Sequence, residues 1–169
     1  LKIFGPHNLQ NLAGALEIAR KLGISKSDFI KAMQNFEGAD RRLQTLGENT
    51  TAKVFFDFAH APSKVRASVA AVKVQYPSRK LLAVVELHTF SSLSQEFLPQ
   101  YHHAMQDADE AIVFFNPEVV AHKKLPSISS EEVADAFDHP SMEVLNDPDA
   151  FKQRLQSLEL KNTNLLLMT

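Results

Sequence analysis

The first 38 residues carry two runs of apolar residues at helical spacing. Members of the first run recur every three or four positions between residues 8 and 22: Leu9, Leu12, Leu16 and Ala19. The second run has the same spacing: Phe29, Ile30, Met33 and Phe36. Gly23 closes the first run and Gly38 ends the second, for which Ser25 or Ser27 is a suitable amino-terminal cap. The pattern predicts two consecutive amphipathic helices.

From residue 41 onward, the pattern indicates a β-hairpin followed by alternating helices and strands. The hairpin joins residues 43–46 to residues 52–56 through a turn at residues 47–49. Apolar runs typical of strands follow at residues 81–87, 111–115, 142–145 and 165–168. Helical patterns start near Pro62, cover residues 97–108, and begin again near Ser129 and Asp147. The sequence therefore predicts an α/β fold: a mostly parallel, Rossmann-like sheet with helices on both faces, preceded by two linker helices and a β-hairpin.

Composition excludes several classes of function. Hydrophobic residues make up 44% and charged residues 22%, the net charge is −2, and cysteine is absent. Disulfides, zinc thiolates and thiol nucleophiles are therefore ruled out, and nothing predicts a nucleic-acid or membrane partner. The chain starts at Leu1 without a methionine and stops in an apolar run at Thr169, so we expect both ends to be cuts in a longer polypeptide.

All five glycines lie at or before Gly47. A backbone cradle for phosphates needs glycines in a strand–turn–helix unit, and neither the dinucleotide fingerprint nor the phosphate loop occurs. If this domain contacts a nucleotide, we expect it to do so with side chains.

Polar residues at the predicted strand ends are the candidates for such contacts, because ligands collect at the carboxyl ends of parallel strands. Asp57 follows one strand, and its carboxylate can accept both hydroxyls of a ribose. His60 at the next helix start suits a carboxylate or phosphate. Glu86 and His88 end another strand and suit an amino-acid substrate. The alternatives are a turn-capping Asp57, a structural His60 and a plain polar loop.

Two further candidate groups precede the sheet. Asn8 and Asn11 share one helix face, where an amide matches the edge of adenine, and His7 can stack on a purine. The alternative is a helix cap and a solvated residue. Arg41 and Arg42 suit phosphate or ribose, or an ion pair with a neighbouring carboxylate.

Metal and hydrolase chemistry are not indicated. The adjacent residues His102 and His103 lie in a predicted helix, where they would point in different directions, and this disfavours a shared metal ion. The nucleophile-elbow pattern G-x-S-x-G does not occur. We therefore assign no catalytic residue and no metal ligand.

Three segments together resemble one family, the Mur ligases. Residues 5–15 resemble the pattern G-x-H-N-x-x-N-x-x-A-A, residues 36–43 resemble F-x-G-x-x-R-R-[FL], and residues 54–62 resemble a strand ending in D-[YF]-[GA]-H-x-P. Their order and spacing also agree. Each pattern is weak alone, but the ordered set is fairly specific.

The resemblance implies a three-domain, cytoplasmic ATP-dependent ligase. Residues 1–38 would be the end of a central ATPase domain, and residues 39–169 the carboxy-terminal α/β domain. The missing amino-terminal and central domains would bind UDP-N-acetylmuramate and the phosphates, with Mg²⁺ held mainly by the central domain. ATP would activate the muramoyl carboxylate as an acyl phosphate, which an amine then attacks. The fragment alone would be inactive.

The resemblance also assigns roles to single residues. His7, Asn8 and Asn11 would meet adenine. Arg42, together with Arg41, would face the phosphates or ribose. Asp57 would hold the ribose, and His60 would lie near the incoming amino group.

The acceptor separates two members of the family. Residues 58–60 are similar to the member that adds L-alanyl-γ-D-glutamyl-meso-diaminopimelate, and residues 86–90 lack the H-R-Y-T-R run typical of the member that adds L-alanine. We therefore favour the tripeptide acceptor, with L-alanine as the alternative. Phe56 and Ala61 depart from the aspartate and histidine common in the family. Two other hypotheses are a stand-alone flavodoxin-like binding module and a folylpolyglutamate synthetase.

Overall fold

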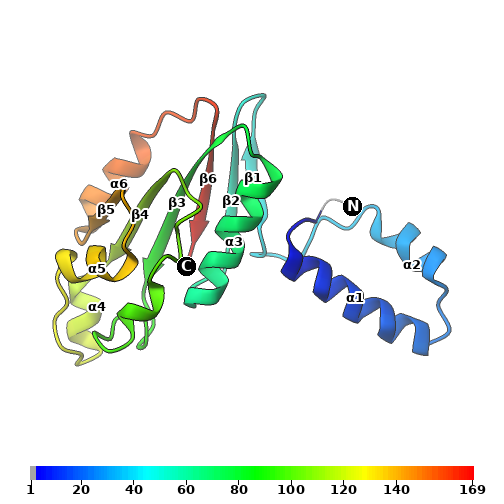
Figure 1. Cartoon of the computed structure of the whole chain (residues 1–169), viewed down its shortest axis with the longest axis horizontal. Coiled ribbons are helices and arrows are strands. Elements are labelled where there is room, and N and C mark those ends of the chain that lie inside the picture. Colours follow the sequence, from blue (N-terminus) through cyan, green and yellow to red (C-terminus); the bar gives the residue numbers. More distant parts are fainter. Residues whose placement is uncertain (1–2) are drawn as a thin grey trace.

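The computed structural model describes residues 3–169, which form a six-stranded sheet with flanking helices (Figure 1). The strand order is β1-β2-β6-β3-β4-β5. Their bounds are β1 Gln44–Glu48, β2 Lys53–Asp57, β3 Lys80–Leu87, β4 Glu110–Phe115, β5 Met142–Leu145 and β6 Thr163–Met168. Only β1 and β2 pair antiparallel, and all other neighbours are parallel. The predicted mostly parallel sheet and its hairpin are confirmed.

Helices surround the sheet and precede it. Their bounds are α1 Pro6–Lys21, α2 Lys26–Met33, α3 Pro62–Gln75, α4 Pro117–His122, α5 Ser130–Phe137 and α6 Pro148–Gln156. Four of them begin at proline, which lacks the N–H that a first helical turn leaves unpaired. Ser25 caps α2, which ends at Met33 before the predicted stop at Gly38. The short helix α4 was not predicted.

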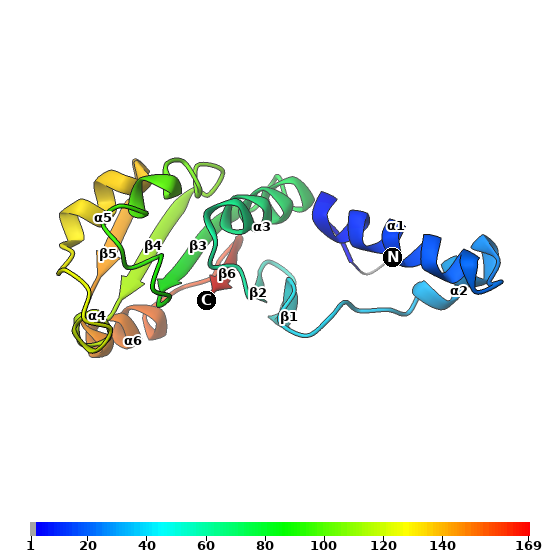
Figure 2. The same ribbon diagram turned by 90° about the horizontal axis from the view of Figure 1, so that it is seen from below.

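Apolar side chains fill both faces of the sheet. On one face, α3, α5 and the turn η1 (Leu98–Tyr101) enclose a core of fully buried residues that includes Phe55, Val69, Phe137 and Leu166. On the other face, α6 covers Leu82, Val84, Ile112 and Leu165. Figure 2 shows α3 and α5 on one side of the sheet and α6 on the other. Helices on both faces are therefore confirmed.

The predicted helix over residues 97–108 is wrong, because only Leu98–Tyr101 is helical, as a 3-10 turn. Consecutive turns follow, in which the N–H of Ala104 donates to Tyr101 O at 2.8 Å and that of Ala108 to Met105 O at 2.9 Å. These turns bury the same apolar residues that a helix would bury. His103 has a φ of 56°, and its N–H donates to Phe137 O at 3.1 Å. This contact with the end of α5 replaces a helical hydrogen bond.

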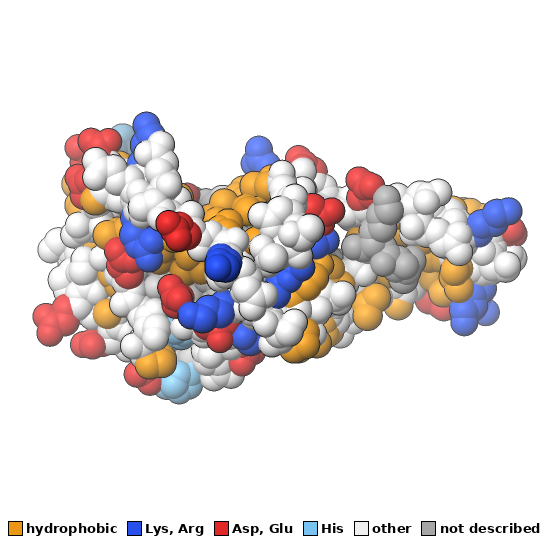
Figure 3. Space-filling view, turned by 90° about the horizontal axis from the view of Figure 1, so that it is seen from above, with side chains coloured by type: hydrophobic (Ala, Val, Ile, Leu, Met, Phe, Trp, Pro, Cys, Tyr) orange, Lys and Arg blue, Asp and Glu red, His pale blue; other side chains and the backbone are white. Residues whose placement is uncertain are grey.

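The segment with α1 and α2 extends away from the sheet (Figure 2). It keeps several large apolar side chains exposed, among them Ile18 at 65% and Leu22 at 75%. Figure 3 shows hydrophobic side chains on the surface of this part of the molecule, at the right. None of the helices within residues 3–169 is long and apolar enough to span a membrane.

Gly5 joins this segment to the sheet domain at a close contact. Its φ is 89°, and a Cβ at this position would lie 2.9 Å from Cβ of Ala71 in α3. The preceding residue, Phe4, packs edge-on against Phe55 at 5.8 Å between ring centroids. Only glycine satisfies both the backbone angle and the contact.

We therefore predict that Gly5→Ala lowers the free energy of unfolding by about 1–3 kcal/mol, because it introduces a strained backbone and a clash. The matched control is Gly14→Ala, in the interior of α1, where a Cβ meets nothing within 4 Å. That substitution should raise stability by about 0.5–1 kcal/mol. Urea unfolding followed by circular dichroism measures both. Equal effects of the two substitutions would contradict the role of Gly5.

Candidate functional site

A cavity of about 250 Å³ lies where α1, the end of β2 and α3 meet. Ten residues line it: His7, Asn8, Gln10, Asn11, Arg42, Asp57, Ala59, Lys64, Ala67 and Ser68. Three separate motifs of the sequence contribute to this one cavity. It therefore brings together the predicted nucleotide contacts His7, Asn8, Asn11, Arg42 and Asp57.

Asp57 is the acidic group of the cavity. It is the last residue of β2, and only 4% of it is exposed. Its Oδ2 accepts a hydrogen bond from the hydroxyl of Ser68 in α3. A carboxylate has more acceptor positions than this single bond uses, so Asp57 retains capacity for the hydroxyl groups of a ligand.

Arg42 and Lys64 supply positive charge to the same cavity. The Arg42 guanidinium donates to Phe58 O at 3.2 Å and lies 5.9 Å from the centroid of the Phe58 ring. The Phe58 N–H in turn donates to Arg41 O at 2.8 Å. These contacts hold Arg42 beside the end of β2. Both basic side chains are exposed and can meet an anion there.

Arg41 does not line the cavity. It is exposed, has a φ of 56°, and its backbone N–H donates to Oε1 of Gln44 at 3.2 Å. The structure thus separates the two predicted arginines. Arg42 lines the cavity and Arg41 shapes the backbone that leads into β1.

His7 contributes a half-buried imidazole whose Nδ1 has no hydrogen-bond partner. Burial lowers the pKa of His7 below its ordinary value of 6.5, the Asp57 carboxylate opposes this, and the cations of Lys64 and Arg42 add to the lowering. An uncharged imidazole is therefore favoured at neutral pH. A neutral ring with an unused nitrogen can stack on a heterocycle and bond to it.

The two asparagines differ in what they already bind. Nδ2 of Asn8 donates to Phe4 O at 2.9 Å, so part of this side chain fixes the entrance of α1. Asn11 lies one turn later, exposed on the same face.

Gln10, Lys64 and Ser68 also line the cavity, although no sequence pattern predicted them there. Lys64 and Ser68 are four residues apart in α3, directly after the Asp57 segment, and this spacing was the available signal.

A second cluster forms at the carboxyl end of the sheet from His60, Glu86, His88 and Thr169. The rings of His60 and His88 are 5.7 Å apart. Oε2 of Glu86 accepts the Thr169 hydroxyl at 2.6 Å, and Nδ1 of His88 lies 3.5 Å from the same hydroxyl oxygen. The structure thus brings together the three residues predicted for a substrate. Thr169 was missed, because its proximity depends on β6 lying beside β3.

Tyr101 fixes the backbone of His60 through a hydrogen bond. The Tyr101 hydroxyl donates to the backbone carbonyl of His60, and burial raises the pKa of Tyr101 to about 12. The phenol therefore stays a neutral donor at physiological pH. Nδ1 of His60 is buried without a hydrogen-bond partner, and its ring packs 4.8 Å from that of Phe58.

Asp57 of the cavity and Glu86 of the second cluster point to opposite faces of the sheet. Asp57 is in register with Met168, and Met168 with Val85, so Asp57 points to the same face as Val85. This is the face that α3 covers. Glu86 follows Val85 and points to the other face. Asp57 and Glu86 thus lie at the same carboxyl edge of the sheet, on opposite faces.

Comparison with known proteins gives the family. The model described as Mur ligase, glutamate ligase domain matches residues 41–169. A UDP-N-acetylmuramate–L-alanine ligase from Gloeobacter violaceus is 34% identical over 159 residues, which are 93% of this chain and 34% of that protein. The chain thus spans about a third of the length of this curated relative.

Solved structures share the fold. The UDP-N-acetylmuramate–alanine ligase of Thermotoga maritima superposes with a TM-score of 0.76 at 19% identity, covering 99% of this chain and 35% of that one. The murein peptide ligase of Psychrobacter arcticus gives 0.64 at 22% identity, covering 98% and 34%. The chain belongs to the Mur ligase family, and it contains the carboxy-terminal domain of such a ligase.

Proposed function

We propose that the full-length protein is an ATP-dependent ligase that joins UDP-N-acetylmuramate to L-alanine, and that this chain closes over the nucleotide. The observation that carries the proposal is the convergence of His7, Arg42 and Asp57, from three separate motifs, on one cavity. Its volume of about 250 Å³ is smaller than the roughly 300–1,000 Å³ of a complete ligand pocket. A cavity of this size fits one part of ATP, with the remainder held by another domain.

The residues of the cavity suit the nucleoside part of ATP. The buried carboxylate of Asp57 would accept ribose hydroxyls, and the uncharged ring of His7 would stack on adenine. Arg42 and Lys64 would meet the phosphates as they leave the cavity. Asn11, and Arg41 from outside the cavity, would add polar contacts when the domains close.

The cavity is poorly suited to bind Mg²⁺. Asp57 is the only carboxylate among the residues that line the cavity, and it already accepts the Ser68 hydroxyl. Mg²⁺ in nucleotide sites is bound by one or two carboxylates together with phosphate oxygens. We therefore assign the ion to the central domain and no metal ligand to this cavity.

Residues 1–38 would be the end of the central ATPase domain, and residues 39–169 the carboxy-terminal domain. The exposed apolar side chains Ile18, Leu22 and Ile30 support this division, because a helix pair with such a surface normally packs on another layer. The other domains would supply the phosphate grip and the UDP-sugar site. We place the enzyme in the cytoplasm, where its nucleotide substrates occur.

In the reaction, ATP would phosphorylate the muramoyl carboxylate, and the amine of the acceptor would displace phosphate from the acyl carbon. The second cluster would receive that amine. The Glu86 carboxylate attracts an ammonium group, and His60 and His88 offer ring nitrogens to the acceptor. These residues bind and orient, and we name none of them as catalytic.

For the acceptor, the sequence motifs favoured the tripeptide, whereas we now propose L-alanine. The related Gloeobacter protein is named an L-alanine ligase, and this favours alanine over the tripeptide. L-Alanyl-γ-D-glutamyl-meso-diaminopimelate stays the second candidate. The ring of Phe58 favours the tripeptide, because it is exposed and packs against His60. It therefore adds apolar surface beside the second cluster, where a longer acceptor could bind.

We predict that Asp57→Asn in the full-length enzyme weakens the binding of a non-hydrolysable ATP analogue by roughly 5- to 150-fold, or about 1–3 kcal/mol, because two ribose hydrogen bonds lose their charged acceptor. Titration calorimetry measures the change. Glu118→Gln, an exposed carboxylate on α4, is the matched control and should have no effect. An unchanged dissociation constant in a folded Asp57→Asn protein would remove Asp57 from the nucleotide site.

We predict that the full-length enzyme releases phosphate from ATP with UDP-N-acetylmuramate and L-alanine, and more slowly with the tripeptide. A coupled phosphate assay at equal acceptor concentrations gives kcat/KM for each. A higher kcat/KM with the tripeptide would contradict the proposed L-alanine acceptor and favour the tripeptide. Activity with neither acceptor would overturn the proposed ligase reaction.

We also predict that the 169-residue chain alone does not hydrolyse ATP, because it has no glycine-rich phosphate loop. Its affinity for ATP should be at least about tenfold below that of the full-length enzyme, since the phosphate contacts are missing. Equal affinity of the two proteins would show that the cavity binds nucleotide without another domain.

A further inference from the structure

We infer that His102, His103 and Asp138 form a binding site for a divalent transition metal of the zinc class. Each residue offers one ligand atom, and these atoms all lie within 4.8 Å of one another. The site lies where the turns after η1 meet the end of α5. It is built from different elements than the nucleotide cavity of α1, β2 and α3.

The distances are close to those that a metal requires. Nε2 of His102 is 3.4 Å from Oδ2 of Asp138, and Nδ1 of His103 is 3.8 Å from the same oxygen. Zinc bonds of about 2.0–2.1 Å in tetrahedral geometry place neighbouring ligand atoms roughly 3.3 Å apart. The atoms lie within 4.8 Å of one another, so side-chain rotations that move each ligand atom by up to about 1 Å would bring all three to one ion.

The backbone holds these residues in place without a metal. His103 and Asp138 both have left-handed backbone angles, with φ of 56° and 50°. The His103 N–H donates to Phe137 O at 3.1 Å, and the Asp138 N–H donates to Ala134 O at 3.0 Å. Arg66 donates to His102 O at 2.9 Å. The predicted helix would have pointed the histidines apart, whereas the observed turns place their ring centroids 3.7 Å apart.

The ligand set selects the metal. Imidazole suits zinc, copper and nickel, whereas magnesium and calcium prefer sites made only of oxygen. The three side chains are 46–61% exposed, so an ion can enter from solvent and water can complete its coordination. Because this set disfavours magnesium, the site is distinct from that of the magnesium proposed to accompany ATP.

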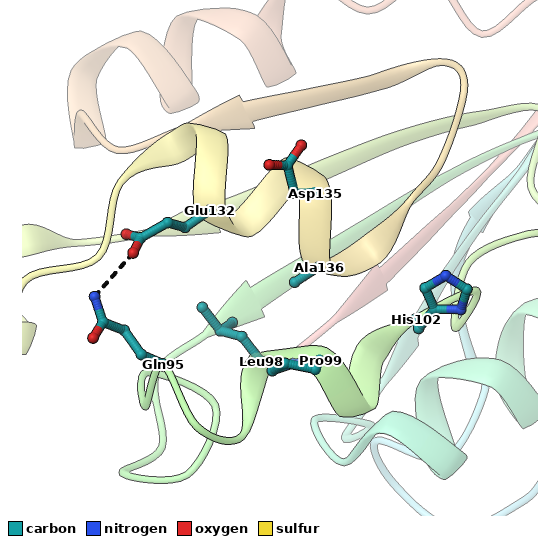
Figure 4. Close-up of a pocket in the computed structure, with 7 residues that line it drawn as sticks. All are labelled: Gln95, Leu98, Pro99, His102, Glu132, Asp135 and Ala136. Atoms are coloured by element: carbon teal, nitrogen blue, oxygen red, sulfur yellow. Dashed lines mark hydrogen bonds between the residues drawn. The ribbon is translucent and has the colours of Figure 1, made fainter.

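A cleft begins at the same place. His102 also lines a cavity of about 450 Å³ between η1 and α5. Figure 4 shows Leu98, Pro99 and His102 on one wall and Glu132 and Asp135 on the other, with His102 at one end. An ion at His102 would join the two walls of this cleft and restrain α5 against η1.

The test is a titration of untagged 169-residue protein with zinc chloride, in competition with a chromophoric chelator. We expect one zinc per chain and no competition from a large excess of magnesium. His103→Ala and Asp138→Ala should each weaken binding at least tenfold. The matched control is His122→Ala, which removes an exposed histidine on α4 and should leave the affinity unchanged. Equal weakening by the control, or no zinc binding, would overturn the proposal.

A second measurement does not depend on variants. Nitrogen chemical shifts of the histidine rings in the wild-type protein should move on zinc addition at Nε2 of His102 and at Nδ1 of His103. Shifts confined to His122 or to other rings would place the ion elsewhere and contradict the site. Circular dichroism of each variant establishes that the fold is retained, as expected for exposed side chains.

Discussion

The insertion of β6 between β2 and β3 is the constraint on which the rest of this structure depends. The last strand of the chain pairs in parallel with both neighbours and thereby joins the hairpin to the remaining strands. Buried Asn164 reinforces the junction, since its Oδ1 accepts from the Lys53 N–H at 3.0 Å and from Arg79 at 3.2 Å. Without β6, β2 would have no partner except β1. The same register fixes which face Asp57 and Glu86 point to.

Elements whose local signals agree with their tertiary surroundings could be predicted from the sequence. The helix α5 is an example, because its sequence predicts a capped start near Ser129 and the structure has a capping box formed by Ser129 and Glu132. The strands β3 and β4 are apolar on both faces over most of their length, and this too is visible in the sequence. The segment after Leu98 could not be predicted. Its apolar spacing fits a helix, but local turn hydrogen bonds and the bond from the His103 N–H to Phe137 O replace the helical pattern.

The candidate site was predictable to the extent that its residues occur in compact motifs. His7, Arg42 and Asp57 each stand in a short pattern, and the fold brings the three patterns together. Ser68 and Thr169 were not predictable in this way. Ser68 is one of several polar residues in α3, and only the helical spacing from Lys64 links it to the cavity. The place of Thr169 depends on strand order. Strand order is a property of the whole sheet and leaves no signal in a single segment.

The end of β2 has a special position between the two clusters. Asp57, the last residue of β2, lines the proposed nucleotide cavity, while the ring of the next residue, Phe58, packs 4.8 Å from that of His60 in the second cluster. The Phe58 carbonyl also accepts a hydrogen bond from Arg42, which lines the cavity, and the Phe58 N–H donates to the carbonyl of Arg41, the residue before Arg42. A ligand that moves Arg42 would therefore act directly on the backbone that carries Phe58. The Arg42–Phe58 hydrogen bond is thus a direct contact between a residue that lines the proposed nucleotide cavity and the segment that leads to His60.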